Sequence, residues 1–580
     1  MIFMKRWFKY IKPYLLFFIL GPLCMIIEVV GEVLMPKYLA MVLGQSADAT
    51  PGYSLGIMAL MILTALIMMA GGLGGAYFGA KASVNFAADL RNDIFTRVQG
   101  FSFSNIDKFS TGSLVTRLTN DVTQMQNFIN MLLRMCLRSP GMMIGALIMA
   151  IMLRPSLAVV LAISIPLLLI SILAIVLRAF PRFSKMQEKV DGLNNTVQEN
   201  VTNVRVVKSF VREDFETEKF AEANSELKNT GMSAMKIMIL LSPVMTLFMN
   251  LTVMAVIWFG GNMVLSESFP MPIEELSAFI TYCTQILTSL MMITMMIMMF
   301  SRAMASAKRI SEVLDETPDI NDFDARQKDQ VVTEGSVEFK NVSFRYYKTS
   351  EEKVLDCINL SIKAGSTVGI IGSTGSGKTT LVSMIARLYD PDEGDVLVDG
   401  VSVKDYTLKN LRDGVGMVLQ KNVLFSGTIE ENLRWGDENA TAEEYSRFAE
   451  YAQADKFVRN FPLGYQTEIE QGGVNVSGGQ KQRLCIARAL LKKPKILILD
   501  DSTSAVDTAT EAQIRRAFKE ELDGSTKIII AQRISSVKEA DEIVVINEGK
   551  IVGKGTHAEL IESCEEYKEI YYSQTEKKEA

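Results

Sequence analysis

Histidine is almost absent from this sequence, and other residues that mark particular functions are few or dispersed. The 580 residues contain one histidine, His557, which excludes a metal site built from several histidines. Six cysteines without a CxxC spacing are too few for a disulfide scaffold, and we expect them to be reduced packing residues. Lys and Arg number 60 against 66 Asp and Glu, a formal charge of −6, so we expect no nucleic-acid partner.

Apolar residues are abundant instead, at 48% of the chain, which excludes disorder over most of its length. A membrane-spanning helix needs about 20 mostly apolar residues. Six stretches qualify, at roughly residues 14–43, 54–80, 129–153, 155–179, 237–265 and 273–300. The first is too long for a cleavable signal peptide. We therefore predict a membrane domain of six helices over residues 1–305, embedded in a lipid bilayer.

The basic residues predict the orientation of this domain. Loops 44–53 and 266–272 contain no Lys or Arg, whereas basic residues flank the first and last stretches: Lys5, Arg6, Lys9, Lys12, Arg302, Lys308 and Arg309. By the positive-inside rule, both termini are cytoplasmic and the protein is multi-pass in the cell membrane, with Arg154 as an exception. The connections 81–128 and 180–236 are long and charged with helical periodicity. We expect the membrane helices to continue beyond the bilayer; two small cytoplasmic hairpins are the alternative.

The second half has the composition of an α/β domain. An acidic, polar linker over residues 306–334 precedes a domain over residues 335–572, and a charged tail, 573–580, is expected to be disordered. Residues 368–371 form an apolar run followed by a glycine-rich loop and a predicted helix from Lys378; further runs lie at 496–499 and 528–531. Alternating strands and helices predict a mostly parallel sheet.

The glycine-rich loop carries the strongest chemical motif. Its residues match the P-loop pattern GxxxxGK[ST]: Gly372, Ser373, Thr374, Gly375, Ser376, Gly377, Lys378 and Thr379, followed by Thr380. Glycines let backbone N–H groups turn toward phosphate oxygens, and the helix N-terminus favours negative charge. Lys378 is expected to reach the β- and γ-phosphates of ATP, and the Thr379 hydroxyl to ligate Mg²⁺. Asp500, at the end of the run 496–499, suits a partner of that Mg²⁺.

A third motif makes the pattern specific. Ser477, Gly478, Gly479 and Gln480 follow Val476 and resemble the LSGGQ signature of ATP-binding cassette (ABC) transporters. The order of P-loop, signature and Asp500 is that of the family. The resemblance implies that the signature of one subunit closes on ATP held by the other. Six helices followed by one cassette resemble half of an ABC exporter, so a second half-transporter is needed.

Further segments extend the resemblance over nearly the whole chain. Tyr346 matches the aromatic residue that stacks on adenine, and Gln420 matches the Q-loop glutamine that contacts Mg²⁺, which implies Thr379, Gln420 and Asp500 around the metal. Residues 504–507 resemble the D-loop and 467–473 the exporter-specific loop before the signature. Residues 107–121 and 203–210 resemble the two internal loops, whose short coupling helices rest on the nucleotide-binding domains.

Two residues depart from the family pattern. Asp501 occupies the position of the glutamate that acts as general base, and Gln532 that of the switch histidine. Aspartate is one methylene shorter, and glutamine carries no charge and shuttles no proton. Neutral drift with slow hydrolysis is one interpretation. The favoured one is a degenerate site that binds ATP, in a heterodimer whose partner supplies a competent site, with a homodimer as the weaker alternative.

The substrate path is less defined. Helix six is rich in methionine, for example Met291 and Met295, which suits a pocket for small amphipathic compounds but equally a lipid-facing surface. Glu28 and Glu32 line a cation-attracting cavity, form ion pairs with Arg134 and Arg138, or lie exposed near the outer membrane surface. We expect a multidrug-type exporter subunit. A lipid flippase and an ATP-gated, channel-like subunit are the alternatives.

Overall fold

The computed structural model describes residues 2–44, 51–265, 271–323, 325–348, 351–501, 506–522 and 524–575. The contacts divide the chain into two units. The first comprises Met1–Arg97 and Gly112–Asp315, and the second comprises Val98–Thr111 and Glu316–Ala580. Residues 504 and 505 of the predicted D-loop, 576–580 of the predicted tail, and most of loops 44–53 and 266–272 lie outside the described residues.

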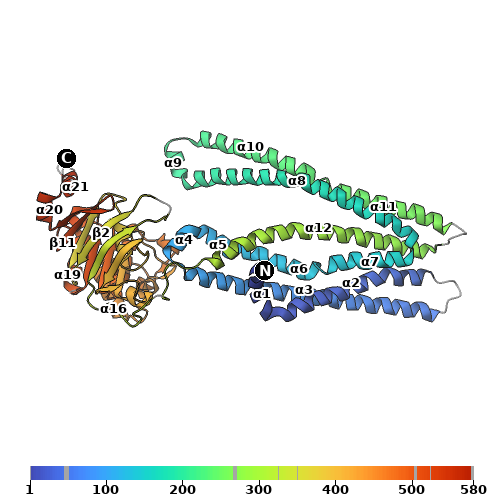
Figure 1. The fold of residues 1–580 in the computed structure, drawn as a ribbon, viewed down its shortest axis with the longest axis horizontal. Helices are drawn as coiled ribbons and strands as arrows, with labels where there is room; N and C mark the ends of the chain where they lie inside the picture. The colour runs from blue at the N-terminus through green and yellow to red at the C-terminus, as the bar shows by residue number, and fades with distance from the viewer. Residues whose placement is uncertain are drawn as a thin grey trace. The chain divides into compact units, whose positions relative to one another are not determined.

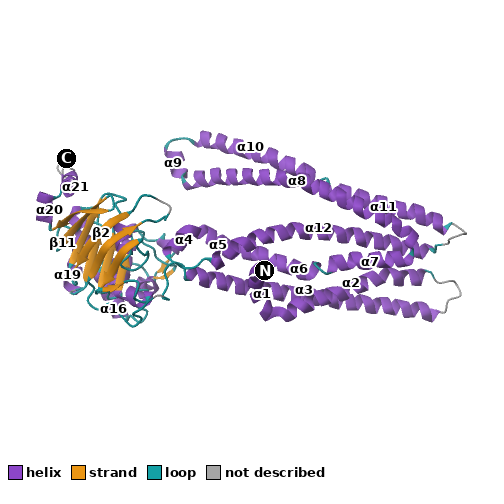
Figure 2. Ribbon diagram, in the orientation of Figure 1, coloured by secondary structure: helices purple, strands orange, loops and turns teal. Residues whose placement is uncertain are grey.

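The first unit is helical (Figures 1 and 2). Its helices are α1 Ile2–Ile11, α2 Leu15–Leu43, α3 Pro51–Gln99, α5 Thr111–Thr116, α6 Val122–Met135, α7 Arg138–Leu153, α8 Pro155–Thr202, α9 Val204–Ser209, α10 Glu213–Met238, α11 Leu241–Val264 and α12 Ile273–Asp315, with a 3-10 turn, η1 Lys12–Tyr14, and a π-turn, η2 Arg117–Asp121. Within the described ranges, six helical segments are long and apolar enough to cross a membrane, which confirms the six predicted spans.

The spans are far longer than a bilayer requires. Pro155–Thr202 contains 48 residues and Glu213–Val264 contains 52. At 1.5 Å per residue, each is more than twice as long as the roughly 30 Å hydrocarbon core. The prediction that the helices continue beyond the bilayer is therefore confirmed, and the hairpin alternative is wrong.

Two of these spans are broken where the sequence analysis treated them as continuous. The third changes helix between Met135 and Arg138, and the fifth between Met238 and Leu241. Pro140 and Pro243 follow these breaks. Proline has no N–H for the helical hydrogen bond and its ring clashes with the carbonyl four residues earlier, so each proline lies in the first turn of the new helix, where that N–H has no partner within the helix.

Helices α2, α7 and α12 contact one another, and α8 runs beside α10 and α11 (Figure 1). The α2–α3 contact depends on glycine, because a Cβ at Gly71 would lie 2.8 Å from the Cys24 carbonyl oxygen. Arg138 on α7 donates to Glu28 Oε1 at 3.2 Å and to Glu32 Oε2 at 3.1 Å on α2. The ion-pair interpretation of the glutamates therefore holds for Arg138.

The second unit contains the strands (Figure 2). They are β1 Val337–Phe344, β2 Leu355–Ile362, β3 Thr367–Gly372, β4 Glu393–Val398, β5 Val401–Ser402, β6 Val415–Val418, β7 Gly427–Thr428, β8 Glu468–Ile469, β9 Ile496–Asp500, β10 Thr526–Ile530, β11 Glu542–Asn547 and β12 Lys550–Gly555. Its helices are α4 Phe103–Phe109, α13 Lys378–Ser383, α14 Leu408–Gly414, α15 Ile429–Arg434, α16 Ala442–Tyr451, α17 Asp455–Arg459, α18 Gly478–Leu491, α19 Thr508–Glu521, α20 His557–Ser563 and α21 Glu565–Thr575. Three short 3-10 turns complete it: η3 Gly464–Gln466, η4 Gln471–Gly473 and η5 Ile534–Ser536.

The main sheet has the order β12-β11-β3-β10-β9-β6 and is parallel except for β12, as predicted. A four-stranded antiparallel sheet, β2-β1-β4-β5, was not predicted. Side chains alternate across the main sheet: Ile496 and Ile498 pack in the same core as β1 and β2, whereas Leu497 and Leu499 pack with α16, α18 and α19. Both faces are therefore covered, which explains the continuous apolar runs.

The end of the linker is fixed by one carboxylate. Asp399 accepts hydrogen bonds from the backbone N–H groups of residues 333–336, at 2.7–3.1 Å. Burial alone would raise the pKa of Asp399, but these four donors together hold it below its usual range. The linker is thus anchored where the antiparallel sheet begins.

Candidate functional site

The P-loop connects β3 to α13. Gly377 caps α13 in the left-handed region with φ 96°, and Gly375 has φ 85°, which glycine adopts without strain. A Cβ at Gly372 would clash with the Ile546 carbonyl oxygen of the neighbouring strand. A Cβ at Gly375 would meet nothing within 4 Å. The loop is therefore packed against the sheet at its start and open at its centre, as a phosphate cradle requires.

Lys378 begins α13 and its ammonium group lies across this loop. Nζ donates to the carbonyl oxygens of Ser373 at 2.6 Å and Gly372 at 2.9 Å, and to Ser376 Oγ at 3.3 Å. Burial lowers the pKa of Lys378, whereas Asp500 and Asp501 oppose that effect. The positive charge is thus held inside the loop, at the place predicted for the phosphates.

Asp500 and Thr379 form the candidate Mg²⁺ position. Thr379 Oγ1 donates to Asp500 Oδ1 at 3.0 Å. The other oxygen, Oδ2, is buried and has no hydrogen-bond partner in the part of the chain that the structure describes. Burial raises the pKa of Asp500, so a cation beside it would offset the cost of its charge. Hydroxyl and carboxylate oxygens are hard ligands, and these two residues fit Mg²⁺.

Asp501 and Gln532 lie at the carboxyl ends of adjacent parallel strands. Asp500 of β9 pairs in register with Ile530 of β10, and the Asp501 N–H donates to the Ile530 carbonyl at 3.0 Å. The Gln532 amide Nε2 donates to Asp501 Oδ2 at 2.9 Å. Burial raises the pKa of Asp501, and Lys378, Arg533 and Gln532 act against it. The two side chains that depart from the family pattern are therefore direct hydrogen-bond partners.

These groups surround one cavity of about 330 Å³. It is lined by residues 374–380 of the P-loop, together with Tyr346, Gln420, Asp500, Asp501 and Gln532. The Tyr346 hydroxyl shares a hydrogen bond with Thr380 Oγ1 at 2.8 Å, which fixes its ring at the rim. The sequence-predicted nucleotide residues thus converge on one site, with Gly372 and Ser373 at the start of its loop.

The signature residues do not contribute to this cavity, as far as its described lining extends. Ser477 caps α18: its side chain accepts from the Gln480 N–H at 3.3 Å, while Gln480 Oε1 accepts from the Ser477 N–H at 2.9 Å. Ser477 and Gly478 are exposed, and Gly479 follows in the first turn. This end of α18 is ordered and open, which suits contact with another molecule.

The sequence analysis missed Tyr389, which connects α4 with Tyr346, the residue expected to stack on adenine. The Tyr389 hydroxyl donates to Asp107 Oδ2 at 2.9 Å, and its ring lies 6.0 Å from that of Phe103. On its other side the ring meets Tyr346 edge-on at 5.3 Å. No motif surrounds Tyr389 in the sequence, and Asp107 is 282 positions away. Only the fold reveals this link.

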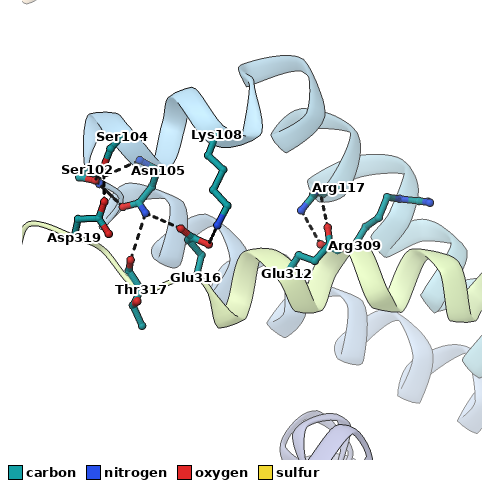
Figure 3. Close-up of polar contacts among 10 residues, drawn as sticks. All are labelled: Ser102, Ser104, Asn105, Lys108, Arg117, Arg309, Glu312, Glu316, Thr317 and Asp319. Atoms are coloured by element: carbon teal, nitrogen blue, oxygen red, sulfur yellow. Dashed lines mark hydrogen bonds and ion pairs between the residues drawn. The ribbon is translucent and has the colours of Figure 1, made fainter. Parts of the chain in front are cut away.

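Further contacts hold α4 within the second unit (Figure 3). Asn105 Nδ2 donates to Glu316 Oε1 at 2.9 Å, Ser104 Oγ donates to Asp319 Oδ2 at 2.8 Å, and Lys108 pairs with Glu316 at 2.7 Å. In the first unit, Arg117 donates to Glu312 Oε2 at 3.1 Å and to the Arg309 carbonyl oxygen at 2.9 Å (Figure 3). Helix α4 and Arg117, on either side of the division between the units, are thus each tied to their own unit by polar contacts.

The second internal loop, in the first unit, ends in an apolar tip. Phe210 is 72% exposed and Val211 is 80% exposed, with Val211 at φ 52°. Valine in this left-handed region is strained, because its branched side chain crowds the backbone. A shallow cavity of about 590 Å³ beside α9 is lined by Val206, Phe210 and Phe215, among others. The tip therefore offers an apolar surface and a hollow that no described element of its own unit covers.

Comparisons with known proteins agree with this geometry. The family described as "ABC transporter transmembrane region" matches residues 18–304, and the family "ABC transporter" matches residues 355–504. The uncharacterized ABC transporter ATP-binding protein YfiB of Bacillus subtilis is 37% identical over 576 residues, covering 98% of both chains.

Two further relatives bear on function. An ATP-dependent lipid A-core flippase of Desulfotalea psychrophila is 35% identical over 490 residues, 84% of each chain. A solved structure of a bacterial Atm1-family ABC exporter with ATP bound superposes with a TM-score of 0.78 at 25% identity, covering 97% of this chain and 98% of that one. ABC exporters of this kind work as dimers in a lipid membrane. The chain belongs to the ABC transporter family: it is an exporter-type half-transporter, with six membrane-spanning helices followed by one nucleotide-binding domain.

Proposed function

We propose that this chain is the degenerate-site subunit of a heterodimeric, ATP-driven exporter of small amphipathic compounds. It lies in the cell membrane with both termini cytoplasmic. Its own P-loop site binds ATP with Mg²⁺ held by Thr379, Gln420 and Asp500, and turns it over slowly. Its signature, residues 477–480, completes a hydrolytic site on the partner. The single observation that carries the proposal is the 2.9 Å hydrogen bond between Gln532 and Asp501.

Asp501 and Gln532 each weaken one catalytic function at the same point. A general base must reach the attacking water with a free oxygen. Asp501 is one methylene too short, and one of its oxygens accepts from the Gln532 amide. The Gln532 amide supplies no positive charge to the negative charge that develops on the γ-phosphate, and it transfers no proton. The intact loop around Lys378 supports ATP binding at this site. We therefore expect ATP turnover to be lost while the affinity for ATP is retained.

Mg²⁺ would neutralise charge on the ATP phosphates, and the chain's own groups do the rest. The loop N–H groups and Lys378 hold and orient the phosphates. Tyr346 offers its ring to the base. Tyr389 joins that ring to Asp107 of α4, so occupancy of the adenine position and the placement of α4 are linked. The apolar tip at Phe210 suits a second subunit as its cover.

A lipid flippase is the second candidate, because one relative is named as a lipid A-core flippase. The two functions share their ATP chemistry and differ in cargo. Proteoliposomes containing the purified transporter distinguish them. ATP-dependent accumulation of a fluorescent amphipathic cation supports the exporter, whereas ATP-dependent movement of a fluorescent phospholipid between leaflets, without cation accumulation, supports the flippase.

The heterodimer is tested by affinity purification of the tagged chain from its native membrane in mild detergent, followed by intact-mass analysis. A 1:1 partner with glutamate and histidine at the positions of Asp501 and Gln532 is the expected result. A homodimer would place both departures in both sites and overturn the asymmetric proposal. If ATP binding without turnover instead opens a passive flux, the channel-like alternative replaces the pump.

A further inference from the structure

We propose that Gln574, in the last turn of the C-terminal helix α21, is a positioning residue for the switch loop that carries Gln532. The inference rests on the proposed function of the site and names one more residue that determines its geometry. Gln574 is not among the described residues that line the nucleotide cavity. It acts through its hydrogen bonds to the backbone of the loop.

The side chain of Gln574 makes two hydrogen bonds to the switch loop. Its Nε2 donates to the Gln532 carbonyl oxygen at 2.8 Å, and its Oε1 accepts from the Ile534 N–H at 2.9 Å. One amide group therefore satisfies a backbone acceptor and a backbone donor two residues apart, as a neighbouring strand would. Only a side-chain amide of this length supplies both groups at once.

Helix α21 is itself firmly held in the second unit. Tyr567 is fully buried in the core that contains Leu560 of α20 and Val545 of β11, and its hydroxyl shares a hydrogen bond with His557 Nδ1 at 2.8 Å. The helix contacts β11, β3 and the turn at residues 534–536, and Figure 1 shows it beside β11. Gln574 therefore extends from a helix whose position is fixed by packing against the core.

The two hydrogen bonds hold the backbone on which the Gln532 side chain is carried. The same Gln532 whose carbonyl is held by Gln574 sends its side chain to Asp501 at 2.9 Å. A shift of the Gln532 backbone moves the group that meets the γ-phosphate, whether that group is an amide or a restored histidine. Displacements near 1 Å at such positions cost up to about 100-fold in rate. Loss of one net hydrogen bond corresponds to a smaller effect, about fivefold.

The experiment uses the full-length chain in its dimer, in nanodiscs, with the partner's catalytic glutamate changed to glutamine so that only this chain's P-loop site turns over. The chain carries Asp501→Glu and Gln532→His to give a measurable rate. Gln574→Ala removes both hydrogen bonds. Gln574→Glu keeps the acceptor for Ile534 and loses the donor to residue 532. Ser573→Ala is the matched control, because the Ser573 hydroxyl bonds the Ile570 carbonyl of its own helix.

We expect Gln574→Glu to lower kcat about fivefold and Gln574→Ala to lower it at least as much, with KM for ATP within twofold, and Ser573→Ala to change neither. If kcat of all three variants equals that of the parent chain, the inference is overturned while the proposed function stays intact. If kcat falls in Gln574→Ala but not in Gln574→Glu, the effect does not depend on the hydrogen bond to the Gln532 carbonyl, which overturns the proposed action through Gln532. If the double substitution gains no ATPase activity, the degenerate-site proposal fails instead. The effect of Gln574→Ala is then measured on the kcat of the chain with its natural Asp501 and Gln532. An unchanged kcat there overturns the inference about Gln574.

Discussion

Exchanging Asp501 for glutamate extends the side chain at the base position by one methylene, about 1.3 Å in reach. In the natural chain, Asp501 Oδ2 is 2.9 Å from the Gln532 amide, and the backbone of Asp501 is in the left-handed region at φ 47°. The carboxylate of a glutamate at position 501 must therefore lose or rearrange the hydrogen bond from the Gln532 amide. We expect Asp501→Glu alone to raise ATP turnover at this site by less than about threefold.

The size of the combined effect follows from what each group supplies. A 1 Å error in the position of a base costs up to about 100-fold. A missing donor to developing charge costs about 100- to 1,000-fold. Groups that act as one unit are strongly non-additive, so restoring one of two recovers little. The Asp501→Glu, Gln532→His double variant is therefore expected to gain about 100-fold or more, and Gln532→His alone less than about threefold.

The assay is single-turnover hydrolysis of radiolabelled ATP by the purified dimer, with the partner's catalytic glutamate changed to glutamine. ATP affinity is measured in parallel with a fluorescent analogue, and we expect it to stay within twofold because the P-loop is unchanged. A gain above about tenfold from Asp501→Glu alone refutes the account in which both residues limit turnover. No gain from the double variant refutes the degenerate-site proposal itself.

Three further predictions follow from other contacts. Asp399→Asn removes a charge-assisted cap and should lower Tm by about 3–10 °C at pH 7; because the folded-state pKa of Asp399 is lowered, this stabilisation is present above pH 4 and lost as the pH falls through that pKa, so the two melting curves should converge in acid. Tyr389→Ala should weaken ATP binding about 2- to 10-fold by removing the ring beside Tyr346, whereas Tyr389→Phe should stay within twofold; equal effects in a fluorescent-ATP titration would contradict this. Arg138→Ala should destabilise the membrane domain by about 2 kcal/mol and Arg138→Lys by less, since lysine lacks the fork that spans two carboxylates, which thermal unfolding in detergent checks.

The membrane domain was predictable because its signal is local. Twenty-residue apolar stretches and charged extensions with helical periodicity are read directly from the sequence, and the six spans and their length follow. The breaks before Pro140 and Pro243 were equally local but were missed, because hydropathy alone does not register a proline. The antiparallel sheet was missed because strands such as β1, with its irregular register, give a weak alternation.

The nucleotide site divides in the same way. The P-loop is contiguous, so its residues and their expected roles are predictable from the sequence alone. Contacts between distant positions carry no such signal. Tyr389 meets Asp107 across 282 positions, and Gln574 meets Gln532 across 42. Neither residue belongs to a motif, and each is positioned by tertiary packing.

The Asp501–Gln532 contact changes how the two departures are weighed. From the sequence, they are two losses at positions 31 residues apart, each a separate argument against turnover. In the fold, parallel strands bring them to one edge and a hydrogen bond joins them, so either side chain constrains what the other position accepts. The Gln532 amide reaches the Asp501 carboxylate at 2.9 Å, and the carboxylate of a glutamate, one methylene longer, would have to take another position. A single reversion therefore breaks an adapted pair before it builds a catalytic one, and only the double variant measures what the site has lost.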